Sequence, residues 1–311
     1  MRSILKNTIL YFLLLGIIVV IGVISPQSVL PNQLMIVIAQ SVPLILAAAG
    51  QSIVILVGGI DLSIYSVIML TNVVSCSIIA GSPENNLTAI VVCLLLGVLV
   101  GLINGLGINY AGIPDFVMTL GMSVILQGIV YTYSKGSPIG SIRGFLATLS
   151  NGKLWSIPYS VIFVSVVVGL LMFMLYKTTF GKRLYATGGN AVASKISGVK
   201  VKVVRTTAYA LCGLLTAMSG LMLSGFVRVA SLGLGSDYVM NSIAATILGG
   251  AAFSGGLLRL ENTVVGALLL GFLMNLLTIL NVAQSGKYIM QGIVIVGIAY
   301  AHLIFRRSSN E

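Results

Sequence analysis

The most informative feature of this sequence is how few charged residues it contains. Only 7% of its 311 residues are charged and 58% are hydrophobic, whereas a soluble domain carries about 25% charged residues. So few charges cannot cover the surface of a soluble body of this size. Most of the outer surface must therefore face lipid, which predicts an all-α integral membrane protein.

Residues that carry catalytic chemistry are also scarce. The single histidine is His302, and Cys76, Cys93 and Cys212 lie inside apolar runs without a CxxC pair, so no metal or redox site is predicted. A P-loop is missing, because Gly181–Arg183 lacks the upstream Gly and the following Ser or Thr of GxxxxGK[ST]. The chain is therefore predicted not to be an enzyme. A membrane enzyme, the alternative, would need a nucleophile, a metal cluster or a carboxylate pair.

Acidic residues are missing from the middle of the apolar runs. All six fall at the ends of these runs, in loops or at the terminus. Ion-coupled carriers keep ionisable groups near mid-membrane, where burying a charge is energetically costly and the group is kept because transport needs it. Their absence argues against a stand-alone secondary carrier or channel. Transport that persists without an ATPase and follows an ion gradient would favour that alternative.

What the sequence does contain is a series of apolar runs free of Asp, Glu, Lys and Arg. A span needs about 20 mostly apolar residues, so Asn7–Ile60 holds two spans, which Pro26 and Pro31 divide. Eight more runs follow, of which Tyr238–Leu258 is rich in Gly and Ala and is either a span or partly re-entrant. The others are Leu62–Pro83, Asn85–Pro114, Phe116–Ser134, Leu154–Tyr176, Thr206–Val227, Asn262–Gly286 and Tyr288–Phe305. About ten transmembrane helices are predicted.

The basic residues predict how these spans are oriented. With both termini in the cytoplasm, twelve of the 17 Lys and Arg residues lie on the cytoplasmic side and five on the other, as the positive-inside rule favours. The predicted cytoplasmic loop 177–205 divides the chain, a single transmembrane domain, into halves of about 1–157 and 158–311. Five spans in each half give the halves opposite orientations, an arrangement common in transporters.

Polar residues within the spans are mostly neutral. Amides can line a path for an uncharged polar solute, or they can simply hydrogen-bond between helices. Asp61 follows Gly58-Gly59 and is placed either to cap the next helix or to take part in a pathway. Gly97, Gly101 and Gly105 share one helix face and predict close helix packing. The neutral residues are Gln40, Gln51, Ser52, Asn72, Asn104, Asn109, Gln127, Asn241, Asn275 and Gln291.

The predicted cytoplasmic loop contains a short helix signal. Asn190 is a good N-cap and Gly198 a good helix stop, so about two exposed helical turns are predicted between them. This local pattern fits a simple connector and a docking element for a soluble partner equally well.

Five stretches in order together resemble the permease subunits of bacterial ABC importers for ribose and related sugars. They cover most of the chain, and no single one would be specific alone. They are Gly59–Ser63 (GIDLS), Phe116–Ile139, Phe180–Asn190 with Ser197–Val199, Tyr209–Leu221, and Ile243–Gly256 with Val265–Asn275.

The resemblance implies a translocation subunit of the bacterial cytoplasmic (inner) membrane. In such importers two permease subunits form the pore, ABC ATPase subunits carrying ATP and Mg dock from the cytoplasm, and a periplasmic or extracellular sugar-binding protein delivers the cargo. The expected cargo is a monosaccharide, with a nucleoside or another small uncharged polar compound as the alternative. No cofactor in this chain and no nucleic-acid partner are expected.

Residue roles follow from the resemblance. It places the coupling helix to the ATPase at Asn190–Gly198, with Asn190, Ala193, Lys195 and Gly198 as candidate contacts. For the translocation pathway we select Gln51, Asp61, Asn72 and Asn104 from the polar residues of the spans.

Two departures from the family pattern matter. Ala191-Val192-Ala193 stands where the family often has Glu-Ala-Ala, which removes a charge-assisted contact to the ATPase. The second permease is therefore either an identical copy or a non-identical paralogue that docks more strongly. In addition, Val239 follows Tyr238 where the family commonly has an acidic residue, while Asp237 precedes it, so substrate preference does not transfer.

Overall fold

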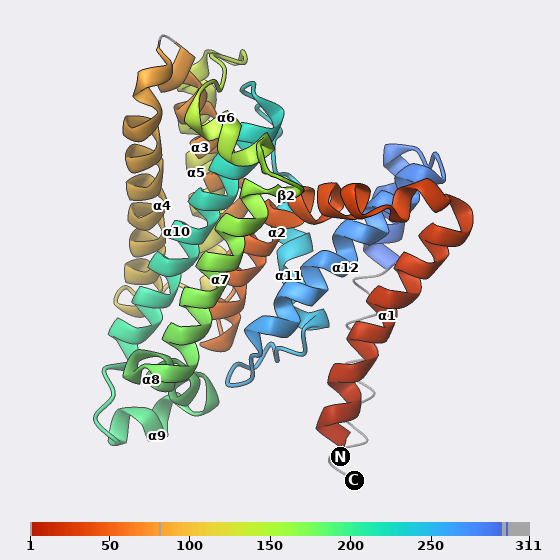
Figure 1. The fold of residues 1–311 in the computed structure, drawn as a ribbon. Coiled ribbons are helices and arrows are strands. Elements are labelled where there is room, and N and C mark those ends of the chain that lie inside the picture. Colours follow the sequence, from red (N-terminus) through yellow and green to blue (C-terminus); the bar gives the residue numbers. More distant parts are fainter. Residues whose placement is uncertain (1, 81, 294–296, 298–311) are drawn as a thin grey trace.

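The computed structural model of the chain describes residues 2–80, 82–293 and 297. Within these residues six helices are long and apolar enough to cross a membrane, and three shorter apolar helices accompany them. The prediction of an all-α membrane protein is confirmed. Figure 1 shows a main body of upright helices with an arm at its side.

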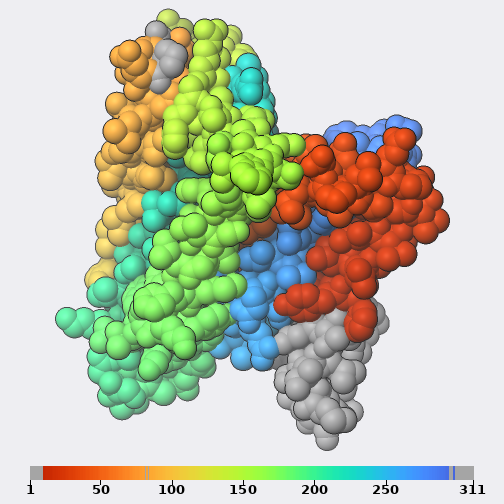
Figure 2. Space-filling model, in the orientation of Figure 1, coloured from red at the N-terminus to blue at the C-terminus, as the bar shows by residue number. Residues whose placement is uncertain are grey.

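The arm is formed by the beginning of the chain and by one late helix. Helix α1 (Arg2–Ile24) is followed by the short η1 (Pro26–Val29) and by α2 (Pro31–Leu56), so Pro26 and Pro31 divide two helices as predicted. Ile21 of α1, Val37 of α2 and Phe272 of α12 (Leu260–Ile279) form a separate apolar cluster. Figure 2 shows this part projecting from the body.

Helix α2 connects the arm to the centre of the body. It contains Pro43, which removes a backbone donor and bends helices, and in Figure 1 the helix changes direction after leaving the arm. Every residue from Ser41 to Leu56 is buried. A helix that is apolar all round belongs inside a bundle, and this part of α2 is therefore the central helix of the body.

The body packs α2 against α3 (Ile64–Ala80), α4 (Asn86–Asn109) and α10 (Val201–Val227). The predicted glycine face of α4 makes the closest approach. A Cβ atom on Gly101 would overlap the carbonyl oxygen of Tyr209, and one on Gly97 would overlap that of Gly213. The close packing predicted from Gly97, Gly101 and Gly105 is therefore confirmed, with α10 as the partner.

Outer helices and short elements complete the body. They are η2 (Pro83–Asn85), α5 (Asp115–Ser134), α6 (Phe145–Asn151), the antiparallel pair β1 (Lys153–Leu154) and β2 (Ile157–Pro158), and α7 (Tyr159–Lys177). Many large apolar side chains of α4, α5 and α7 are exposed, among them Leu95, Val124 and Leu170. These faces suit contact with lipid.

The segment predicted as loop 177–205 is more ordered than the sequence indicated. It contains α8 (Thr179–Gly189), which the sequence prediction missed, and α9 (Ala191–Ile196). Thr178 caps α8 by accepting a hydrogen bond from the backbone of Gly181. Because α10 already begins at Val201, Lys202 and Arg205 belong to a helix rather than to the loop.

The last predicted spans differ most from expectation. Tyr238–Leu258 is not one helix: α11 (Tyr238–Leu248) has 11 residues and is followed by turns up to Arg259. Such a helix reaches about 16 Å, too short to cross the membrane core of about 30 Å. Residues 284–293 are helical, whereas His302 and most of the predicted span Tyr288–Phe305 lie outside the described residues.

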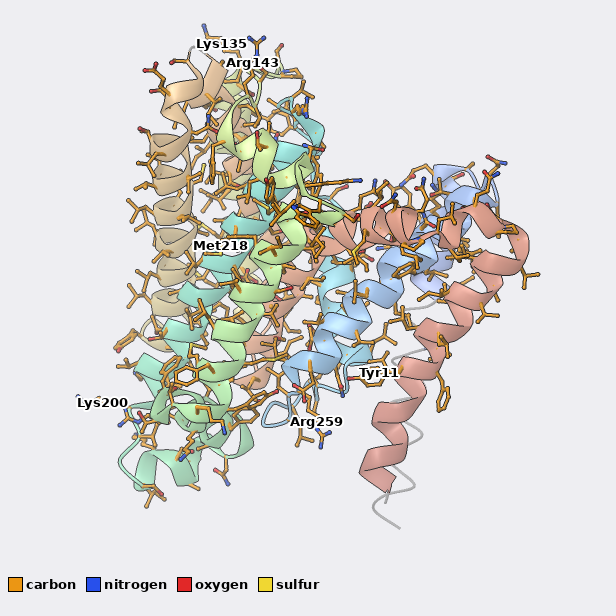
Figure 3. All side chains as sticks on the ribbon, viewed as in Figure 1. Tyr11, Lys135, Arg143, Lys200, Met218 and Arg259 are labelled. Carbon is orange, nitrogen blue, oxygen red and sulfur yellow. The ribbon has the colours of Figure 1, made fainter. Side chains whose placement is uncertain are left out.

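Basic residues mark the two ends of the body. Figure 3 shows Lys200 and Arg259 at one end and Lys135 and Arg143 at the other. Figure 1 places α8, α9 and the beginning of α1 at the first of these ends, here called the α9 end. The separation agrees with the predicted sides of the membrane, but which end faces the cytoplasm stays a prediction.

Candidate functional site

Helix α9 has the features expected from the sequence. The Oδ1 atom of Asn190 accepts a hydrogen bond from the backbone of Ala193 at 2.9 Å, and Gly198 has a φ of +83°, which a glycine adopts without strain. The predicted cap and stop are confirmed. Asn190, Ala193, Lys195 and Gly198 are all exposed, while their contact with an ATPase stays a prediction.

Helix α9 also has an exposed apolar face, whose residues are not among the candidates predicted from the sequence. Val192 is 70% exposed and Ile196 is 83% exposed, and their spacing of four places both on one helix face. A groove of about 600 Å³ lies beside them, lined by Tyr110, Val192, Lys195, Val199 and Lys200 among others. The sequence contained a signal for this face, because Val192 and Ile196 are large apolar residues four positions apart in a segment between two spans.

The end of α8 is held in a junction of backbone segments from three parts of the chain. We call this the glycine junction; it consists of Leu56, Gly58, Gly188, Gly189, Gly255 and Gly256. The backbone of Gly256 donates to the carbonyl of Leu56 at 2.9 Å. A Cβ atom on Gly188 would overlap that same carbonyl. The segment before α9 therefore contacts the end of α2 and the α11–α12 turns directly.

Two tyrosines connect α7 and α8 to the turns before α12 and to the first turn of α12 itself. The hydroxyl of Tyr185 donates to the carbonyl of Leu258 at 2.9 Å, and that of Tyr176 donates to Glu261 at 2.6 Å. Their rings stack with centroids 6.5 Å apart. Burial raises the pKa of Tyr185. These contacts connect α7 and α8 directly to the turns before α12 and to the start of α12.

A first group of polar residues is sealed inside the body near the α2–α3 turn. Asp61 is 2% exposed, and its Oδ1 atom accepts from the backbone and the hydroxyl of Ser63 at 2.8 and 2.6 Å. The amide of Asn104 donates to the same hydroxyl at 3.0 Å. Because α3 begins at Ile64, the backbone N–H that Asp61 binds lies just before the helix rather than in its first turn, and both the capping and the pathway interpretations stay predictions.

Helix α10 contributes a second part of this sealed group. Tyr209 is fully buried and donates to Asp115 at 2.9 Å, and Arg205 forms an ion pair with the same carboxylate at 3.4 Å. A Cβ atom on Gly59 would overlap the Tyr209 hydroxyl. The GIDLS turn, α5 and the first turns of α10 are therefore locked together.

Asn72 and Gln51 are also sealed. The amide nitrogen of Asn72 donates to Ser224 at 3.0 Å, and its oxygen accepts from the backbone of Ser231 at 2.8 Å. Gln51 is fully buried, and neither polar atom of its side chain has a partner among the described residues. We call Gln51, Asp61, Ser63, Asn72, Asn104 and Tyr209, which are all buried, the sealed group. The pathway role predicted for Gln51, Asp61, Asn72 and Asn104 stays a prediction.

A second group of polar residues surrounds an open cavity of about 310 Å³ between the first part of α2, α11 and α12. We call it the polar cavity. Its polar lining residues are Gln40, Ser41, Asp237, Tyr238, Asn241, Asn275 and Thr278. Sequence reasoning included Gln40, Asn241 and Asn275 among its neutral residues but did not select them.

No group of three or more His, Cys, Asp or Glu residues within the described parts of the chain could hold a metal ion. Its polar chemistry consists of amides, hydroxyls and isolated carboxylates. The chain combines an exposed short helix, α9, with an open polar cavity in a helix bundle whose outer faces are apolar, and this combination fits a membrane transport subunit.

Comparison with known proteins places the chain within this class. It belongs to the family described as the permease component of the branched-chain amino acid transport system, which matches residues 33–299.

Several curated relatives match almost the whole chain. The ribose import permease protein of Escherichia coli (strain K12) is 33% identical over 289 residues, which cover 91% of this chain and 89% of the relative. The ribose import permease protein of Bacillus subtilis (strain 168) is 34% identical, with 90% and 87% covered. The D-allose transport system permease protein of E. coli is 30% identical, with 94% and 91% covered. No solved structure matches the chain.

Proposed function

We propose that the chain is the transmembrane subunit of an ATP-driven ABC importer that brings a monosaccharide into the cytoplasm. The relatives named as ribose and D-allose permeases support a sugar cargo, and the neutral amides and hydroxyls of the polar cavity suit such a solute. A nucleoside or another small uncharged compound is the alternative cargo. The chain itself catalyses no reaction.

The observation that carries this proposal is the exposed apolar face of α9. Val192 and Ile196 are exposed, and they lie on a short helix that is not one of the long apolar helices. An exposed apolar patch of this kind marks a contact with another protein. The partner would be an ABC ATPase that carries ATP and Mg. Lysines 195, 200 and 202 at the groove favour an acidic rim on that partner.

The assembly would resemble that of other importers. We infer about ten membrane crossings in two halves of opposite orientation, one of them made by α11 together with the non-helical residues beside it. Both termini would lie in the cytoplasm of a bacterium, with the chain in its inner membrane. A second permease, identical or paralogous, would complete the pore against an exposed apolar helix face. A periplasmic or extracellular sugar-binding protein would deliver the cargo at the end opposite α9.

Transport would proceed by alternating access. Closure of the ATPase subunits would displace α9 and α8. The glycine junction and the bonds of Tyr176 and Tyr185 join α8 to the end of α2 and to the α11–α12 turns. Because packed interfaces switch between discrete arrangements, this displacement would tilt α11 and α12 and alternately open the two sides.

The test is co-purification of candidate ATPase subunits with the chain, together with ATP hydrolysis in liposomes measured with and without binding protein and sugar. Ile196→Glu places a charge on the docking face, and we expect it to reduce ATPase association by about ten-fold or more. Trp155→Glu changes a residue that is 94% exposed on the β1–β2 hairpin and should leave association unchanged.

Two results would overturn the proposal. The first is a chain that moves sugar in liposomes without ATP or any partner, which would make it a secondary carrier. The second is an ATPase that binds Ile196→Glu as well as the natural chain while Trp155→Glu weakens binding, which would place the docking site elsewhere.

A further inference from the structure

The polar cavity has a position in the fold that sets it apart from the other polar residues of the body. One helix beside it, α11, has only 11 residues, and its first residue, Tyr238, lies at the cavity. Helix α2, which continues through Pro43, lines another side with Gln40, Ser41 and Leu44. Transporters place substrate sites at the ends of helices that begin or stop within the membrane.

The cavity has room for a small molecule and is open. Its volume of about 310 Å³ lies at the lower end of the range for small-molecule sites, about 300–1,000 Å³. Figure 1 shows α11 about halfway along the body, between the end that carries α6 and the α9 end. A Cβ atom on Gly271 would overlap the hydroxyl of Ser41, so this glycine allows α2 and α12 to approach beside the cavity.

The hydrogen-bonding groups of the cavity are only partly used within the chain. Asn241 accepts from the amide of Gln291 at 2.7 Å, and Thr278 accepts from Lys287 at 2.9 Å. Among the described residues, the side-chain amides of Gln40 and Asn275 have no hydrogen-bond partner. Each free amide can both donate to and accept from a ligand hydroxyl.

The charges at the cavity are of both signs. Asp237 is the one charged side chain among the residues that line it, and the ammonium of Lys287 lies 2.9 Å from the hydroxyl of the lining residue Thr278. A carboxylate accepts hydrogen bonds from two hydroxyls. The apolar walls formed by Leu44, Leu270 and Met274 suit the C–H faces of a ring. Because the two charges are of opposite sign, the site matches a neutral ligand with several hydroxyl groups better than a sugar phosphate.

From this geometry we propose that the polar cavity is a transit-binding site for an uncharged polyhydroxylated solute of monosaccharide size, held by Gln40, Asp237, Asn241 and Asn275. The inference rests on the proposed importer function and names where the cargo binds inside the membrane. It also connects sugar binding to the displacement of α8 by the ATPase, because α11 and α12 are joined by the turns that contact α8.

Cysteine labelling tests this site directly. The native Cys76, Cys93 and Cys212 are all buried, so the unmodified chain in its complete transport complex should not react with a small hydrophilic thiol reagent. Asn275→Cys and Thr278→Cys should react. Ribose, D-allose or galactose at saturating concentration should slow both reactions by about five-fold or more, while L-leucine and ribose 5-phosphate should not.

The matched control is Ser137→Cys, which places a thiol on an exposed loop at the other end of α5 from Asp115. It should react at the same rate with and without sugar. Equal labelling of Asn275→Cys and Thr278→Cys with and without every sugar would overturn the site, and so would protection by L-leucine instead.

A second measurement separates this inference from the importer function. Asn275→Leu keeps the side-chain size but removes the amide, and it should lower sugar uptake by about ten-fold while ATP hydrolysis stimulated by the binding protein is unchanged. ATP-driven sugar uptake by the natural chain, combined with normal uptake by Asn275→Leu, would overturn the site alone. No ATP-driven uptake by the natural chain would overturn the importer function.

Discussion

The sealed group and the polar cavity are built from the same residue types and differ in what surrounds them. In the sealed group Asn72 and Asp61 bond to other helices and to backbone, and they are at most 2% exposed. In the cavity Gln40 and Asn275 line an opening between α2, α11 and α12. The difference teaches that a polar residue within a span is open to a solute only where the surrounding helices leave a cavity beside it.

The largest effect is expected from breaking the packing that closes the sealed group. Gly101→Leu would force α4 away from the backbone of Tyr209 and Ala210. We expect a loss of about 3 kcal/mol or more of folding free energy, seen as loss of folded protein in membranes. Gly169→Leu on α7, where a Cβ atom meets nothing within 4 Å, is the control. Equal yields of both variants would contradict the packing account.

A second prediction sharpens the comparison with one substitution in two places. Asn72→Leu leaves the backbone N–H of Ser231 without its partner, and unmade buried bonds cost about 1–3 kcal/mol. Thermal unfolding in detergent should therefore shift to lower temperature. Asn275→Leu, which removes an amide facing the cavity, should unfold at the temperature of the natural chain. A larger shift for Asn275→Leu would reverse the assignment of the two groups.

A third prediction concerns the connection between α8 and the cavity helices. Tyr185→Phe removes the hydrogen bond to Leu258, worth about 0.5–1.5 kcal/mol. We expect more ATP hydrolysed per sugar transported, because a displacement of α8 reaches α11 and α12 less completely. Tyr131→Phe on the exposed side of α5 is the control. If Tyr185→Phe hydrolyses the same amount of ATP per sugar as the natural chain, the displacement of α8 reaches the cavity helices by another route.

The smallest effect is expected at the rim of the cavity. Gln40 is exposed, so Gln40→Ala should leave the unfolding temperature unchanged, within about 0.5 kcal/mol. The sugar concentration for half-maximal uptake should rise by about two- to three-fold, as expected for one partly solvated hydrogen bond. A drop in stability would mean that Gln40 belongs to the packing instead.

Much of the fold could be predicted from the sequence, because the relevant signals are local. Pro26 and Pro31 separate α1 from α2, the glycine face of α4 indicates a close helix partner, and Asn190 with Gly198 delimits α9. Each of these features depends on a few neighbouring residues and on backbone geometry that they fix.

Other elements could not be predicted, because their causes lie far away in the chain or in weak signals. Helix α8 is only 11 residues long and contains three glycines, so its sequence resembles a loop. Helix α11 ends at Gly249-Gly250, where the chain turns toward α12. Asn72 meets Ser231 across 159 residues, so the sequence alone does not separate sealed amides from those of the cavity.

The measurement that tests the account most directly compares Asn275→Leu and Asn72→Leu in the same reconstituted liposomes. Sugar uptake and binding-protein-stimulated ATP hydrolysis are measured together and divided by the amount of folded protein. We expect Asn275→Leu to lose about ten-fold in uptake while hydrolysis persists, and Asn72→Leu to retain both activities per folded molecule. The opposite result, normal uptake per folded Asn275→Leu and uptake lost in folded Asn72→Leu, would contradict it and return the pathway to the sealed group.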